Sequence, residues 1–152
     1  MLKMSSQQRI EKASELIANN ATNFMHYFRE LMGIFTGHID EESLTKLQQI
    51  WMVARKLIRD GDMVHMVGHY FLQFREPILN QDDEYMMSYD YETLIVSDCV
   101  EKTKNLIRHL VSSIKSVYRL NDPQLNIQVR SAIINITECA IIHERLVKVI
   151  DN

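Results

Sequence analysis

EKTKNLIRHLVSSIKSVYRLNDPQLNIQVRSAIINITECAIIHERLVKVI, residues 101–150, decides the fold of this chain. Around it, small and apolar residues recur in alternating steps of three and four, the spacing of one helix face. The two stripes are Val96, Cys99, Thr103, Leu106, Leu110, Ser113, Val117 and Leu120, then Leu125, Val129, Ala132, Ile136, Cys139, His143, Leu146 and Ile150. Between them, Asp122 suits an N-cap and Pro123 the first helical position. We therefore expect a long antiparallel helical hairpin with a very short turn.

Shorter helices are predicted before this hairpin. The first begins near Ser5 or Ser6, and Asn19-Asn20 interrupts its pattern, so a kink or break is expected there. Its apolar stripe is Ile10, Ala13, Ile17, Phe24, Phe28, Leu31 and Phe35. The second begins after Asp40, a good N-cap residue. Gly61 fits the position just past its end, where Asp62 can cap a third helix that runs to Pro77.

The composition favours an all-α fold in one domain, residues 1–152. The chain has four glycines and two prolines among 152 residues, too few for the tight turns of hairpins and Gly-rich loops. The pattern predicts an up-and-down helical bundle of about five helices that ends in the C-terminal hairpin. The alternative arrangement is a dimer in which the long hairpins pack together, so a homo-oligomer is among the expected partners.

The expected location is intracellular and cytoplasmic. The first residues, MLKMSSQQR, lack the apolar core of a signal peptide, and no apolar run approaches the ~20 residues that span a bilayer. Cys99 and Cys139 fall within helical patterns, as buried thiols in a reducing compartment would. The sequence thus predicts no membrane partner.

EPILNQDDEYMMSYDYE, residues 76–92, is the one stretch that departs from helical pattern. Residues 61–100 hold eight acidic side chains and a single basic one, Arg75, although the whole chain carries only −3. Tyrosine and methionine, which adapt to partner surfaces, accompany the acids. The predicted partner-binding residues are Asp82, Asp83, Glu84, Tyr85, Met86 and Tyr89. The alternative is that Tyr85, Met86 and Tyr89 fold inward and plug the end of the bundle.

The stretch His69–Tyr91 resembles a recurrent pattern in small helical proteins of large nucleocytoplasmic DNA viruses. There an aromatic helix runs into a proline, then an acidic step and a pair of large apolar residues. The matching residues are Phe74, Pro77, Ile78 or Leu79, Asp83-Glu84 and Met86-Met87; the methionines depart from the more usual aromatics. The resemblance covers about one seventh of the chain and implies a viral, non-enzymatic protein.

Catalytic and metal-binding motifs are incomplete in this sequence. His65 and His69 lie four residues apart and would share one helix face, but Met66 stands where HExxH has its glutamate. His143 follows Cys139 on the seam of the last helix, where a core or interface histidine is the simpler interpretation. No phosphate-binding glycine loop or nucleophile elbow occurs. We expect no enzyme, no cofactor and no metal, with His65 and His69 as weak metal candidates.

One row of basic residues supports an alternative function. Lys104, Arg108, Lys115 and Arg119 are separated by four, seven and four residues, so they share a face opposite the apolar seam. Such a row, facing solvent, can track phosphates and would make the chain a nucleic-acid-binding helical protein. The preferred hypothesis is an interaction or assembly protein that docks a partner protein through residues 76–92.

Overall fold

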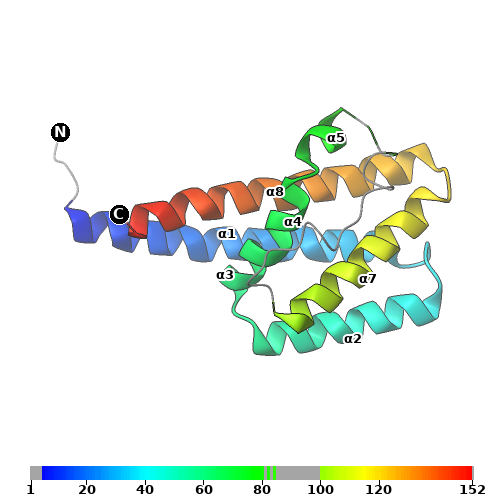
Figure 1. Ribbon diagram of the computed structural model, residues 1–152, viewed down its shortest axis with the longest axis horizontal. Helices are drawn as coiled ribbons and strands as arrows, with labels where there is room; N and C mark the ends of the chain where they lie inside the picture. The colour runs from blue at the N-terminus through cyan, green and yellow to red at the C-terminus, as the bar shows by residue number, and fades with distance from the viewer. Residues whose placement is uncertain (1–4, 81, 83, 85–99, 152) are drawn as a thin grey trace.

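The computed structural model describes residues 5–151, apart from residues 81, 83 and 85–99. The fold is a bundle of α-helices, and the described residues include no strand (Figure 1). Its elements are α1 (Ser6–Phe35), α2 (Glu41–Leu57), α3 (Asp60–Met63), the π-helical turn η1 (Val64–Gly68), α4 (His69–Leu72), α5 (Arg75–Leu79), α7 (Glu101–Tyr118) and α8 (Pro123–Asp151). The predicted all-α class is confirmed.

Helix starts are the most accurately predicted local features. Ser5 caps α1, and its hydroxyl accepts from the Gln8 N–H while the Gln8 side chain accepts from Ser5 N–H, a reciprocal capping box. The Asp40 carboxylate accepts from Ser43 N–H at 2.9 Å at the start of α2. At α8, Asp122 accepts from the Gln124 N–H at 3.0 Å, and Pro123 is the first helical residue.

Several predicted helix boundaries were wrong. Asp62 lies inside α3 instead of capping it, and the third helix ends at Leu72 while Pro77 lies inside α5. α1 runs unbroken through Asn19-Asn20, because the buried Asn20 amide donates to the Cys139 carbonyl of α8 at 2.8 Å instead of breaking its own helix. α2 ends at Leu57, and Gly61 lies inside α3 rather than after α2. A Cβ at Gly61 would stand 3.6 Å from the His143 ring, an ordinary van der Waals contact, so α3 packs close to α8 at this point.

The helices pair differently from the predicted C-terminal hairpin. α7 and α8 are joined by a short turn in which Asn121 has a φ of 54°. They diverge from it, and the predicted packing of one along the other is not confirmed. α8 instead lies along α1, and α7 lies along α2 (Figure 1). The core forms where the two pairs meet, and Phe28 stacks on Trp51 there at 4.1 Å between ring centroids.

A broken helix formed by α3, η1 and α4 crosses the α1–α8 pair and closes the core (Figure 1). Gly68, at the end of the π-helical turn, allows this close crossing, because a Cβ there would lie 2.6 Å from the Ala140 Cβ. π-helical turns occur often at functional sites. His65 lies in this turn and His69 directly follows it, and their rings are 6.1 Å apart between centroids, next to α8.

Candidate functional site

The predicted partner-binding segment is described only at its beginning. Asp82 and Glu84 are exposed, whereas Asp83, Tyr85, Met86 and Tyr89 lie outside the described residues. The choice between a docking segment and a structural plug, which depends on those tyrosines and Met86, therefore stays a prediction. What the structure does describe is the helix from which the segment leaves the bundle.

That helix is α5, which is short and stands out from α8 at the top of Figure 1. Pro77 is tolerated because it lies in the first turn of a five-residue helix. The chain then folds back, since Asp82 N–H donates to the Pro77 carbonyl at 2.7 Å. An open hollow of about 640 Å³ results, lined by Leu72, Gln73, Arg75, Glu76, Pro77, Asn80 and Asp82. We call α5 and this hollow the acidic shoulder.

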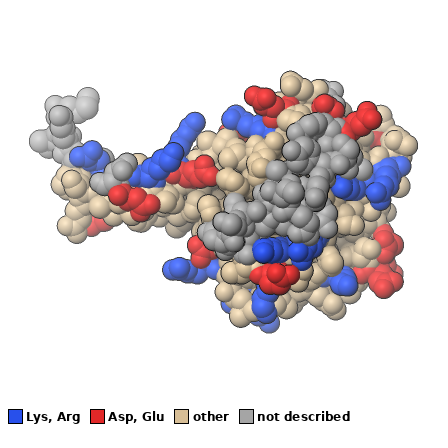
Figure 2. Space-filling model, viewed as in Figure 1, with Lys and Arg blue, Asp and Glu red and all other residues tan. Residues whose placement is uncertain are grey.

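The acidic shoulder carries more acidic than basic side chains, and its one basic residue, Arg75, contacts α8. The Arg75 guanidinium donates to the Glu138 carboxylate of α8 at 2.8 Å and ties α5 to the bundle. Glu76, Asp82 and Glu84 are all exposed. Figure 2 shows acidic side chains gathered at the edge of the body where α5 lies in Figure 1. An exposed field of one sign attracts partners of the opposite sign.

The basic row on α7 is less exposed than predicted. Arg119 is exposed, but Lys104, Arg108 and Lys115 are half-buried. The Arg108 guanidinium donates to the Glu101 carboxylate at 3.2 Å and to the Asn105 side chain at 2.9 Å. These contacts reduce the positive charge that Arg108 can present to a phosphate. The expectation that the whole row faces solvent is wrong, and the nucleic-acid hypothesis stays a prediction.

The fold gathers histidines that are distant in sequence. The His65 and His69 rings are 6.1 Å apart between centroids, and His69 Nδ1 lies 3.3 Å from the Glu144 carboxylate of α8. Asp62, His65, His143, Glu144, Val147 and Lys148 line a hollow of about 420 Å³. Among the described residues, no group of three or more His, Cys, Asp or Glu side chains is arranged to hold a metal ion.

His143 is the buried member of this group, with 8% of its surface exposed. Its Nδ1 is buried and has no hydrogen-bond partner among the described residues. Burial, and then the nearby His65, lower the pKa of His143 below its ordinary value of 6.5, while Asp62 and Glu144 oppose the shift. Folding therefore favours the neutral form of this ring. Sequence reasoning placed it on the seam but could not show that α3 and η1 would meet it.

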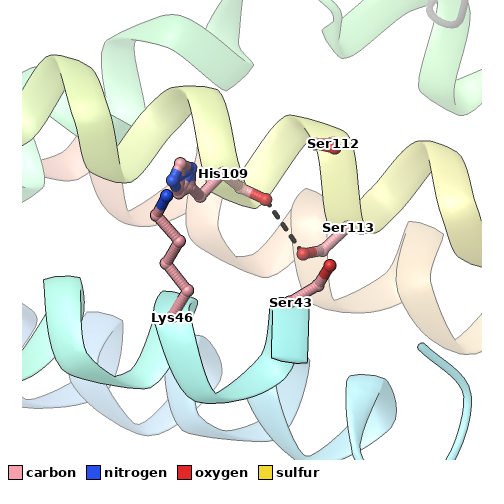
Figure 3. Close-up of a pocket in the computed structure, with 5 residues that line it drawn as sticks. All are labelled: Ser43, Lys46, His109, Ser112 and Ser113. Carbon is pink, nitrogen blue, oxygen red and sulfur yellow. Dashed lines mark hydrogen bonds between the residues drawn. The ribbon is translucent and has the colours of Figure 1, made fainter. Parts of the chain in front are cut away.

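A small polar hollow of about 150 Å³ lies between α2 and α7, lined by Ser43, Lys46, His109, Ser112 and Ser113 (Figure 3). Burial, and then Lys46, lower the pKa of His109. The Ser113 hydroxyl donates to the backbone carbonyl of His109 at 2.9 Å, so its proton is not directed at the ring. No carboxylate among the lining residues orients the imidazole. The geometry is not that of a serine nucleophile and its base.

Cys139 is buried and forms no disulfide. Burial, and then the adjacent Glu138, raise the pKa of its thiol to about 11. Because the thiolate is the reactive form, this cysteine is chemically quiet at neutral pH, as expected of a core thiol. Cys99, the other predicted buried thiol, lies outside the described residues.

No helix among the described residues is long and apolar enough to cross a membrane. Comparison with known proteins finds no matching family model, no matching curated protein and no matching solved structure. The resemblance of His69–Tyr91 to viral helical proteins therefore stays a prediction, and the function is argued from the chain's own residues.

Proposed function

We propose that this chain is a non-enzymatic interaction protein that docks a partner protein with a basic or apolar surface at residues 76–92. The observation that carries the proposal is the pairing of Arg75. It is the single base between residues 61 and 100, and its guanidinium is directed to Glu138 at 2.8 Å. The residues that follow it in sequence are rich in carboxylates, and an excess of negative charge suits steering of a basic partner.

The acidic shoulder also offers an apolar contact. Leu79, at the end of α5, is 53% exposed, beside a hollow of about 640 Å³. An exposed leucine between Glu76 and Asp82 in the sequence suits an amphipathic basic helix, which carries apolar and cationic side chains together. The salt bridge to Glu138 holds α5 in position, so docking onto this part requires little ordering of the shoulder.

Asp83, Tyr85, Met86 and Tyr89 belong to the same proposal on sequence grounds alone. Tyrosine brings a large amphipathic ring, and methionine a flexible thioether that fits irregular surfaces. Viral origin is also part of the proposal, and it rests on the sequence resemblance of residues 69–91 alone. The absence of a catalytic arrangement in the described hollows is compatible with a binding role but does not establish one.

The test is binding of a fluorescent amphipathic Lys/Leu helical peptide, followed by anisotropy over a series of NaCl concentrations. Replacing Asp82, Asp83 and Glu84 with Asn, Asn and Gln is expected to weaken binding by about tenfold at low salt and to flatten its salt dependence. A matched control replaces Glu11, Glu15 and Glu30 with Gln on α1, which removes the same charge elsewhere.

Equal affinity of the wild type and the Asp82/Asp83/Glu84 variant across the salt series would refute docking at this segment. An equal loss in the Glu11/Glu15/Glu30 variant would also contradict it, because the peptide would then respond to total charge alone. Circular dichroism of all three proteins checks that the helices are intact.

Nucleic-acid binding through Lys104, Arg108, Lys115 and Arg119 is the second proposal from the sequence. Its support is the regular spacing of the four cations; the Glu101 contact of Arg108 counts against it. Anisotropy titration with labelled duplex and single-stranded oligonucleotides at low salt tests it, and no binding to either would remove it.

A further inference from the structure

The N-terminal part of α1 and the C-terminal part of α8 form a two-helix arm, residues 6–19 and 140–151. Its outer end projects beyond the rest of the bundle (Figure 1), while its inner end meets the crossing segment at Ala140, His143 and Glu144. The arm holds nine Ile, Leu or Val side chains, and none of them is buried. They are Ile10, Leu16, Ile17, Ile141, Ile142, Leu146, Val147, Val149 and Ile150. Two packed helices alone cannot cover this much aliphatic surface, so part of it stays in contact with water.

The two helices of the arm keep one antiparallel register. Where the arm meets the bundle, the Asn20 amide donates to the Cys139 carbonyl at 2.8 Å. Ten residues further out on each helix, Ile10 and Val149 line one hollow of about 340 Å³. Ala13, buried between these two points, lets the helices approach closely. The register therefore sets Ile10 beside Val149, and Ile17 at the level of Ile142.

Four of the nine side chains share one face. Ile17 follows Ile10 by seven residues, and Val149 follows Ile142 by seven, a spacing that returns nearly to the same side of a helix. Ile10, Ile142 and Val149 are each 41–44% exposed. We call Ile10, Ile17, Ile142 and Val149 the apolar patch. Leu16 is also exposed but is turned about 100° from Ile17 around the helix axis, away from the patch.

The charges of the arm favour a partner of the same kind. It carries four bases and four acids, which are Arg9, Lys12, Arg145 and Lys148, and Glu11, Glu15, Glu144 and Asp151. The net charge is zero, and Figure 2 shows both signs on the arm. Two such surfaces do not repel each other, and each offers acids to the other's bases. A strongly acidic or basic partner finds no complementary field on the arm.

We propose that the arm pairs with the arm of a second copy of this chain, so that two apolar patches pack together in a four-helix bundle. Two layers at heptad spacing are the packing that such bundles use. The face is roughly 20 Å long and roughly 20 Å wide, from a 1.5 Å rise per residue and a helix diameter of 10–12 Å. That is roughly 400 Å² on each copy and roughly 800 Å² in total, below the size of a stable specific interface, so the pairing is weak and the dimer dissociates at low concentration. The pairing is independent of docking at the acidic shoulder.

Sedimentation velocity from roughly 1 µM to roughly 1 mM, where small interfaces dissociate, tests the pairing. The wild type is expected to shift from the 17.9 kDa monomer to a dimer across this range. Ile10→Glu with Val149→Glu places like charges in the patch and should weaken dimerisation more than tenfold. The matched control, Leu16→Glu with Asn19→Glu, adds the same charge on another side of α1 and should dimerise like the wild type.

Mixing two variants of opposite charge distinguishes loss of pairing from loss of folding. Ile10→Lys with Val149→Lys is expected to be monomeric alone and to form a mixed dimer with the Ile10→Glu/Val149→Glu variant. A wild type that stays monomeric at the highest concentration overturns the proposal. So does a dimer that the Glu variant leaves intact, or one that the control weakens equally. Two folded monomeric variants that fail to restore a dimer when mixed contradict pairing through this face.

Discussion

The two halves of the α1–α8 pair have similar aliphatic periodicity and opposite environments. Beyond Asn20, toward the centre of the bundle, Phe24, Phe28 and Leu31 of α1 are fully buried. In the arm, the aliphatic residues of the same two helices stay partly exposed. The difference is that, of the described elements, α3, η1 and α4 cross the pair and reach the arm at its inner end, at Ala140, His143 and Glu144, while the outer end projects beyond them (Figure 1). Periodicity therefore identifies a helix face, while tertiary packing decides whether that face becomes core.

The largest expected effect comes from truncating the inner half. Phe28→Ala removes a fully buried ring that stacks on Trp51 with an interplanar angle of 15°. Loss of transfer free energy, together with the remaining cavity, should lower the free energy of unfolding by about 4 kcal/mol. Urea unfolding followed by circular dichroism measures the change.

The matched substitution in the arm is Leu16→Ala, at a residue 39% exposed. We expect a loss below about 1 kcal/mol, since little surface is buried around it. If the two variants lost comparable stability, the arm would be as tightly packed as the centre, and the contrast between the halves would fail.

Gly68→Ala is expected to cause the second-largest loss of stability. It tests the point where the segment of α3, η1 and α4 crosses α8. The new Cβ would lie 2.6 Å from the Ala140 Cβ, and a rigid helix stands behind each atom. The resulting displacement should cost about 2 kcal/mol in the same unfolding assay. Adding Ala140→Gly makes room for the methyl group and should recover part of the loss.

Gly33→Ala serves as the opposite control for this position. Gly33 lies inside α1 with no heavy atom within 4 Å of a new Cβ. Alanine should stabilise the helix there by about 0.5–1 kcal/mol. Destabilisation of similar size at both glycines would show that the Ala140 contact is not what makes Gly68 sensitive.

The last prediction concerns pH dependence at His143, where the arm joins the bundle. The pKa of this histidine is lowered on folding, so the unfolded chain binds more protons than the folded chain as pH falls. Stability is therefore fully present above about pH 6.5 and declines below it, with a slope from one histidine of at most about 1.4 kcal/mol per pH unit. His109, lowered in the same direction, adds to the slope.

Urea midpoints between pH 7.5 and 5 measure this decline. His143→Gln, which cannot take up a proton in this range, should reduce the dependence without removing the part due to His109. An unchanged pH profile in the variant would show that the buried ring does not resist protonation.

The sequence predicted local structure better than the arrangement of helices. Asp40 and Asp122 were recognised as caps, and a helix start was expected near Ser5 or Ser6, because capping depends on residues two or three positions apart. Asp62 was also predicted as a cap, and this was wrong because α3 begins at Asp60. The partner of α8 was missed because a heptad stripe on α8 fits α7 or α1 equally well. Asn20 illustrates the limit: its residue type indicated a break, but a hydrogen bond to Cys139 makes it a link between two helices.

The candidate sites also differ in how much of each could be predicted from the sequence. The acidic charge of residues 76–92 could be read directly from composition, whereas the pairing of Arg75 with Glu138 joins residues 63 positions apart and needed the fold. The histidine group around His143 also combines distant segments. Ile10 belongs to the predicted apolar stripe of α1, yet it is 41% exposed near the outer end of the arm, which the stripe alone could not show.

Hydrogen–deuterium exchange at increasing protein concentration tests the contrast between the two halves most directly. Pairing of arms protects amides by mass action, while the inner half is already protected in the monomer. We predict that exchange of residues 6–19 and 140–151 slows as concentration rises, while exchange of residues 24–35 stays constant. Arm exchange that does not change with concentration, or that matches the inner half at every concentration, would contradict the account.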